Sequence, residues 1–184
     1  MTDERMGDAV WPALCGMPPG SGVVFRHYAT SDKDRRAMLQ RVKRIAVARR
    51  LVVVVAGPSL IGPSSIGPSS VGADGVHGRI RTRATAGIRT WPAHDRAEAL
   101  ARQRAGADAL FVSPVHATRS HAGASGLGPA RAMRIGRGLG IPVIALGGMD
   151  ELRWRRIRRF GFHGWAAIDA WVRQARRPPD FVAR

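Results

Sequence analysis

The sequence predicts an α/β protein whose strands form a parallel sheet. Short apolar runs rich in β-branched residues, such as LVVVVA at 51–56, alternate with longer segments whose apolar residues recur at helical spacing. Glycine-containing phrases separate the two kinds of segment, as expected where a helix ends and a strand begins. The 184 residues are enough to bury a sizeable core, so we expect residues 1–184 to form a single domain.

The first clear strand is predicted at 23–26 and is followed by a helix at 32–50. Ser31 or Asp32 is expected to cap that helix, because either side chain can accept a hydrogen bond from its first N–H groups. The helix has one apolar stripe, formed by Met38, Leu39, Val42, Ile45 and Ala46. Further strands are predicted at 51–56, 74–77, 87–91, 109–113, 142–146 and 164–168, and further helices at 95–105, 129–139, 151–160 and 170–175.

Two segments interrupt the alternation. The repeat IGPSSIGPSS at 61–70 stands where a helix is due, but its prolines and glycines predict a loop or a degenerate helix. At the N-terminus, no strand precedes the polar segment TDERMGD. If the sheet closes as an eight-stranded barrel, its first strand is therefore missing or cut short. The phrases GADG at 72–75 and AGAD at 105–108 are interpreted as structural turns that each lead into a strand.

Charge and composition limit the possible partners. The formal net charge is +17, but 28 of the 30 basic residues are arginines, a bias that GC-rich coding explains as well as a polyanionic partner does. The run RWRRIRRFG at 153–161 is predicted to be a solvated helix face, with Leu152, Ile157 and Phe160 turned inward. We therefore expect an anionic small molecule, and not nucleic acid, as the ligand.

The cellular compartment is predicted from the lack of a membrane span, a signal peptide and paired cysteines in the sequence. Its apolar runs are too short to span a bilayer, and the acidic, polar start is not a signal peptide. The single Cys15 excludes a disulfide framework or a cysteine-based zinc site within one chain. We expect a cytoplasmic protein with no membrane partner.

Two strand ends carry candidate chemistry. VIALGGM at 143–149 is a buried strand ending in two glycines, which allow backbone N–H groups to approach a phosphate; the alternative is a plain strand-to-helix turn. The loop LFVSPVHATRSHAGASGLG at 110–128 can be a phosphate cradle with acid–base groups, or a solvated loop whose histidines satisfy local hydrogen bonds. Its candidates are Thr118, Arg119 and Ser120 for phosphate, and His116 and His121 for proton transfer.

Other histidines also follow strands. His77 ends the strand in GVHGR, where a structural role is the more common one, and His94 precedes Asp95, a predicted helix cap. No carboxylate accompanies these histidines at ligand spacing, so we predict no metal site among them.

The order of five motifs resembles the thiamine phosphate synthase and TenI (thiazole tautomerase) superfamily. The motifs are GVVFRHY, GADGVHG, AGADALFVSPVHATRSHAG, PVIALGGM and GFHGWAAIDAW, and the resemblance runs from residue 1 to about 172. It implies a TIM (β/α)8 barrel. TDER at 2–5 is similar to the end of the family's first strand, so the fold expected is such a barrel with that strand truncated or missing at the N-terminus.

The resemblance also implies a reaction. The family's synthases join hydroxymethylpyrimidine diphosphate to a thiazole phosphate, with Mg²⁺ and basic groups stabilising the departing pyrophosphate. Of the family's Q-x-R-x-K pyrophosphate strand only Arg26 is kept, with Val24 and Tyr28 at the other two positions. The Asn-Asp pair falls at 56–57, which reads Ala-Gly, and GVHGRIRTR lacks the second aspartate. Mg²⁺ is thus possible from the resemblance, but both expected aspartate ligands are absent.

The thiazole-phosphate half is better preserved. Thr118 and Ser120 keep the two hydroxyls of the family's T-x-T-K loop, where His121 replaces the lysine, and Gly147 and Gly148 match its phosphate turn. Ile168 and His77 complete the substrate-binding set expected from the resemblance, while Asp169 stands where the family has a small or hydroxyl residue. A tautomerase histidine would fall at Pro114, and His116, two residues further on, would point the same way on a strand.

We therefore expect an enzyme of thiamine biosynthesis that binds a phosphorylated small molecule, with Arg26, His116 and His121 as catalytic candidates. The reaction expected is the synthase coupling or a related tautomerase step. The alternative is a catalytically degenerate binding or regulatory relative without the Mg²⁺–diphosphate half-site. An opened barrel can also pair with a second copy to cover its exposed edges.

Overall fold

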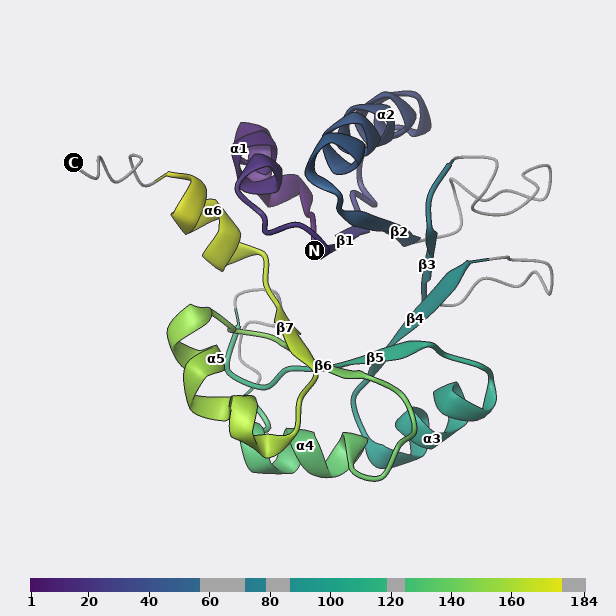
Figure 1. The fold of residues 1–184 in the computed structure, drawn as a ribbon, viewed down its shortest axis with the longest axis vertical. Coiled ribbons are helices and arrows are strands. Elements are labelled where there is room, and N and C mark those ends of the chain that lie inside the picture. Colours follow the sequence, from purple (N-terminus) through teal and green to yellow (C-terminus); the bar gives the residue numbers. More distant parts are fainter. Residues whose placement is uncertain (57–71, 79–86, 119–124, 177–184) are drawn as a thin grey trace.

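A computed structural model describes residues 1–56, 72–78, 87–118 and 125–176. Seven parallel strands form one sheet in which each strand pairs with the next along the chain, from β1 to β7. The sheet curls, and the helices lie on its outer side (Figure 1). The strands are β1 (Gly22–Phe25), β2 (Val52–Ala56), β3 (Gly75–His77), β4 (Ile88–Ala93), β5 (Ala109–Val112), β6 (Val143–Leu146) and β7 (Gly164–Ala166).

The helices between the strands confirm the predicted alternation, but the N-terminal helical segment was not predicted. They are η1 (Glu4–Ala9), α1 (Val10–Cys15), α2 (Asp32–Arg49), α3 (Arg96–Arg104), α4 (Pro129–Gly136), α5 (Glu151–Ile157), η4 (Arg158–Phe160) and α6 (Asp169–Ala175). None of the helices in the described segments is long and apolar enough to cross a membrane. The repeat at 61–70 lies outside the described residues.

Helix ends follow the side chains that cap them. Ser31 Oγ accepts a hydrogen bond from the Asp34 N–H at 3.2 Å, and Asp95 Oδ1 accepts one from the Glu98 N–H at 2.8 Å, which confirms both predicted caps. Helix α4 ends at Gly136, three residues earlier than predicted. It stops there because the next residue, Arg137, has extended backbone (φ −60°, ψ 130°) and leads into a glycine with positive φ.

The sheet edges come together at the N-terminus of the chain. The Met1 amino group donates a hydrogen bond to the Ala167 carbonyl just beyond β7, at 3.0 Å. The Thr2 N–H donates to the Val24 carbonyl of β1, at 2.8 Å. Two residues thus lie between the edge strands, where an eight-stranded barrel would have a complete strand. The described residues form a curled seven-stranded sheet of the TIM-like type, and not the closed (β/α)8 barrel.

Core residues occupy both faces of the curled sheet, because successive side chains of a strand point to opposite faces. Val23 and Phe25 of β1 belong to a cluster with the buried α2 residues Leu39 and Val42. Val24, between them, belongs to a separate cluster with Val54, Ala56 and Phe111 inside the curl.

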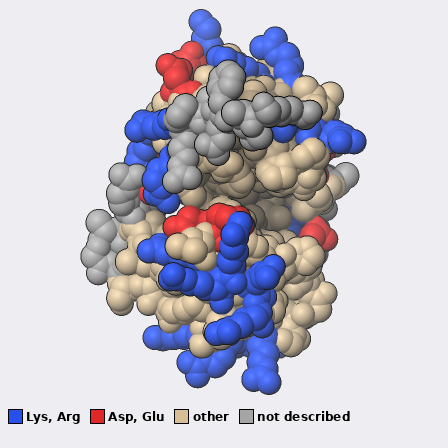
Figure 2. Space-filling view, turned by 60° about the vertical axis from the view of Figure 1, so that its left-hand side comes forward, with Lys and Arg blue, Asp and Glu red and all other residues tan. Residues whose placement is uncertain are grey.

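Helix α5 turns only one of three predicted residues inward. Ile157 is buried, but Leu152 is 60% exposed and Phe160 is 38% exposed, so the prediction for these two was wrong. Leu152 lies five residues before Ile157, which places it about 140° away around a helix. The arginines of α5 and η4 are exposed, and basic side chains gather over the lower half of the face in Figure 2.

The two glycine phrases tie neighbouring strands together at the amino-terminal end of the sheet. Asp74 accepts a hydrogen bond from the Val53 N–H with Oδ2, at 2.7 Å, and its own N–H donates to the Val53 carbonyl at 2.8 Å. Asp108 makes the same pair of bonds with Arg89, each at 2.7 Å. These turns, interpreted above as structural, therefore clamp β3 to β2 and β5 to β4.

Candidate functional site

A small cavity opens at the carboxyl-terminal ends of the strands. Its volume is about 70 Å³, and residues that follow β1, β5, β6 and β7 line it together with Met1. Five predicted site residues meet there: Arg26, Thr118, Gly147, Gly148 and Ile168. Asp169 also lines the cavity. The structure thus brings together residues from four strand ends that are up to 143 positions apart in the sequence.

The Gly147–Gly148 turn packs directly against the loop after β5. Both glycines have positive φ, 96° and 60°. A Cβ on Gly147 would lie 2.8 Å from Pro114 Cα, and a Cβ on Gly148 would lie 2.5 Å from the Ala117 carbonyl oxygen. The His116 N–H donates a hydrogen bond to the Gly147 carbonyl at 3.1 Å. Only glycine fits this close approach of the two backbones, which places the turn beside Thr118.

Arg153 supports the turn from α5 and was not identified from the sequence. Its Nη1 donates a hydrogen bond to the Gly148 carbonyl. Asp150 caps α5 by accepting a hydrogen bond from the Arg153 N–H at 2.9 Å, which sets the arginine in the first helical turn. In the sequence, Asp150 and Arg153 follow the two glycines at the spacing of a helix cap and its third residue. Arg153 could not be singled out, because it belongs to a run of arginines.

His116 lies next to this turn and does not line the cavity. A Cβ on Gly148 would approach the His116 Cβ to 2.9 Å. The His116 Nε2 atom is buried and has no hydrogen-bond partner among the described residues. Burial lowers the pKa of His116, the nearby Arg153 lowers it further, and Asp150 opposes them. Its imidazole is therefore neutral at pH 7, and its catalytic role stays a prediction.

His77 points into the core of the curled sheet. It is 7% exposed, and its Nδ1 atom lies 2.9 Å from Thr90 Oγ1. Its ring meets that of Phe111 edge-on, with centroids 5.1 Å apart. Burial lowers the pKa of His77 to about 4, and the charge of Arg26 adds to this effect. His77 is not among the residues that line the cavity, and its substrate-binding role stays a prediction.

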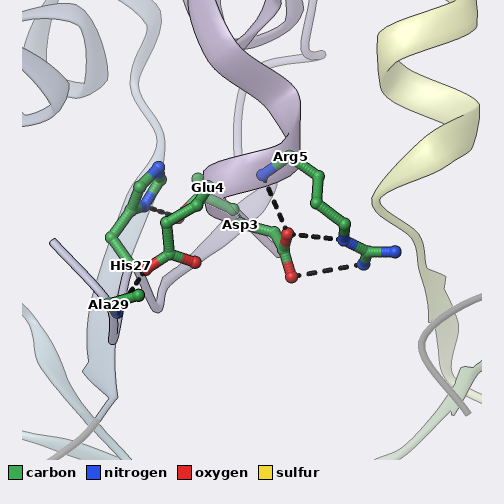
Figure 3. A network of polar contacts seen from close by, with 6 residues as sticks. Asp3, Glu4, Arg5, His27 and Ala29 are labelled. Atoms are coloured by element: carbon green, nitrogen blue, oxygen red, sulfur yellow. Dashed lines mark hydrogen bonds and ion pairs between the residues drawn. The ribbon is translucent and has the colours of Figure 1, made fainter.

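The N-terminal segment holds the loop that follows β1. Strand β1 ends at Phe25, so Arg26 begins this loop, and His27 has a positive φ of 32°. The Glu4 carboxylate accepts a hydrogen bond from the Ala29 N–H at 2.6 Å, and Asp3 pairs with Arg5 at 2.7 Å (Figure 3). The Glu4 contact joins the N-terminal segment to the loop that begins at Arg26, whereas the Asp3–Arg5 pair lies within the N-terminal segment itself.

The residues at the end of β2 do not fit a magnesium site. Ala56 ends this strand, and its carbonyl oxygen accepts a hydrogen bond from Nη2 of Arg35. Residues 57–71 and 79–86, which follow β2 and β3, contain no aspartate or glutamate. Within the described segments, no three His, Cys, Asp or Glu side chains cluster. Mg²⁺ prefers carboxylate oxygens, and here a guanidinium contacts the strand ends instead.

Three predicted residues of the loop after β5, Arg119, Ser120 and His121, lie outside the described residues. Their roles stay predictions.

A curled parallel sheet with helices on its outer side and a cavity at the carboxyl ends of its strands places the chain in the class of TIM-like barrel proteins. The family model described as thiamine monophosphate synthase (TMP-TENI) matches residues 19–171, and the chain belongs to this family. This confirms the resemblance drawn from the five motifs.

Individual relatives agree with the family. The chain is 31% identical over 148 residues to a thiamine-phosphate synthase of Geobacillus thermodenitrificans, covering 73% of this chain and 66% of that protein. It is 37% identical over 83 residues to one of Chloroflexus aurantiacus, covering 44% and 38% of the two chains. The chain thus spans no more than 66% of these curated relatives. A thiamine phosphate pyrophosphorylase structure from Pyrococcus furiosus has the same fold, with TM-score 0.73, 19% identity and coverage of 95% and 92%.

Proposed function

We propose that this chain acts in thiamine biosynthesis and binds a thiazole phosphate in the cavity at the strand ends. The reaction is the coupling of hydroxymethylpyrimidine diphosphate with the thiazole phosphate, or a related thiazole tautomerase step. One observation carries the proposal: Thr118, Gly147, Gly148 and Arg26 line the same cavity. A hydroxyl, a glycine backbone and a guanidinium are the groups that commonly bind phosphate oxygens.

The two halves of the cavity have different tasks under this proposal. The Gly147–Gly148 turn and Thr118 bind the phosphate group, because all three line the cavity and a glycine turn lets backbone N–H groups approach an anion. Arg26, from the loop after β1, faces the same cavity and stabilises negative charge that develops on a leaving group. Asp169 also lines the cavity, and its carboxylate repels a phosphate dianion placed beside it.

Calorimetry with thiazole phosphate and with the corresponding thiazole alcohol tests the proposal. The two ligands differ only in the phosphate group, so the alcohol isolates the contribution of the phosphate site. We expect the phosphate ester to bind about 10- to 100-fold more tightly than the alcohol, the range that one or two charge-assisted hydrogen bonds supply. No binding of thiazole phosphate at millimolar concentration would contradict the proposal.

A second candidate function is that of a non-catalytic relative that only binds the phosphorylated ligand. It is favoured by Val24, Tyr28 and Ala56, which replace the polar residues expected for the diphosphate half. The two candidates differ in turnover. Release of pyrophosphate from the two thiamine precursors, measured with and without Mg²⁺, would exclude the binding-only function.

A further inference from the structure

Two arginines gather at the ends of β1 and β2, where the family's metal and diphosphate are expected. We propose that this end of the site binds a diphosphate group through the guanidinium charges of Arg26 and Arg35, without a divalent metal ion. The inference rests on the proposed function, since Arg26 belongs to the same cavity. It predicts a ligand that carries a diphosphate, and a site whose affinity for it is independent of Mg²⁺.

Arg35 lies on α2 and is completely buried, with 0% of its surface exposed. Its Nη2 atom donates hydrogen bonds to the carbonyl oxygen of Arg26, at 2.8 Å, and to that of Ala56. These are backbone oxygens at the carboxyl ends of two paired strands. Carbonyl oxygens of this kind are also metal ligands, so the guanidinium uses atoms that a cation at this place would need. Since arginine keeps its proton in proteins, the positive charge is permanent.

Tyr28 brings the two guanidinium groups into one cluster. The Cζ atoms of Arg26 and Arg35 lie 5.4 Å and 5.8 Å from the centroid of the Tyr28 ring, within range of cation–π contacts. Tyr28 stands where the family has a lysine. Arg35, on α2, supplies a positive charge close to the position of that missing lysine. Tyr28 is 55% exposed and Arg26 lines the cavity, so a ligand can reach Arg26 from solvent, while the buried Arg35 acts on it through its charge and not by direct contact.

The positive charges of Arg26 and Arg35 also act on histidines at neighbouring strand ends. Burial is the main cause of the lowered pKa values of His27 and His77, and Arg26 lowers both further. Arg35 also lowers the pKa of His27, while Glu4 and Asp3 oppose it. Within the described segments the Arg26 guanidinium forms no ion pair with a carboxylate. Its charge is therefore available to an anionic ligand.

Calorimetry of the full chain with inorganic pyrophosphate tests this inference, once in excess EDTA and once in excess Mg²⁺. We expect dissociation constants that agree within about threefold in the two buffers. In EDTA, Arg26→Gln is expected to weaken pyrophosphate binding by at least about tenfold, the effect of one charge-assisted contact. The matched control is Arg36→Gln, which removes the same charge from the exposed residue next to Arg35 and is expected to change the affinity less than about threefold.

Three results would overturn the inference: pyrophosphate binding only in the presence of Mg²⁺, equal losses in the Arg26 and Arg36 variants, or no pyrophosphate binding at millimolar concentration. Thiazole phosphate titrated into the same samples separates the two proposals. If it binds while pyrophosphate fails, the metal-free diphosphate site is wrong and the proposed function stands. If thiazole phosphate also fails, the proposed function falls with it.

Discussion

Replacing Gly148 by alanine should both destabilise the protein and damage the cavity. Its φ of 60° is strained for any residue with a Cβ, at a cost of about 1–2 kcal/mol. The added Cβ would also lie 2.5 Å from the Ala117 carbonyl oxygen, a backbone atom that can move only with its loop. Overpacking of this kind costs about 1–3 kcal/mol more. We therefore expect Gly148→Ala to lower the free energy of unfolding by about 2–5 kcal/mol.

Gly138→Ala separates the two contributions. Gly138 has a similar φ of 71°, but nothing lies within 4 Å of the position its Cβ would take. Its variant should therefore show the backbone cost alone, about 1–2 kcal/mol. Urea denaturation measures both free energies, and calorimetry with thiazole phosphate should show a loss of affinity of about tenfold or more for Gly148→Ala only. Equal stabilities of the two variants, within about 0.5 kcal/mol, would refute the close packing of the turn against the loop.

Three further predictions use other residues. Burial lowers the pKa of His77 to about 4 in the folded protein, against about 6.5 in the unfolded chain, so the unfolded chain takes up the proton first as the pH falls. The free energy of unfolding, measured by urea denaturation, should therefore drop by up to about 3 kcal/mol between pH 6.5 and pH 4, and His77→Gln should flatten this decline. Arg35→Met removes the donor shared by the Arg26 and Ala56 carbonyls, and should lower the unfolding free energy by about 2–4 kcal/mol in urea titrations, with Arg35→Lys recovering part of the loss. Thr118→Val should weaken thiazole phosphate binding about tenfold in calorimetry, whereas Thr30→Val, outside the cavity, should leave the affinity as it is.

Local signals explain why much of the fold could be predicted. Ser31 and Asp95 lie immediately before apolar-periodic segments, and both cap helices as expected. Parallel strands joined by helices bring their carboxyl ends to one edge, so Arg26, Thr118 and Gly147 were expected at the same end before any contact was known. The N-terminal helical segment was not predicted, because Gly7 and Pro12 interrupt any helical period there.

The contacts of Arg35 and Arg153 could not be predicted from the sequence. Arg35 is one of 28 arginines, and nothing in its neighbourhood in the sequence separates it from the exposed Arg36. Its burial follows from the pairing of β1 with β2, because it bonds the carbonyl oxygens of Arg26, directly after β1, and of Ala56, the last residue of β2. Arg153 is hidden in the same way, since its bond to the Gly148 carbonyl depends on where α5 begins. Contacts that depend on tertiary packing leave no periodic trace in a charge-rich sequence.

The paired bonds of Asp74 with Val53 and of Asp108 with Arg89 have a consequence for engineering. They lock adjacent strands at the edge of the sheet opposite the cavity, through side chains that the cavity does not use. A combinatorial library restricted to the loops at the carboxyl ends of the strands would thus vary ligand preference and leave these hydrogen bonds intact. Stabilising substitutions at the amino-terminal ends of the strands, made first, would raise the free energy of unfolding. The library could then tolerate destabilising substitutions in the loops.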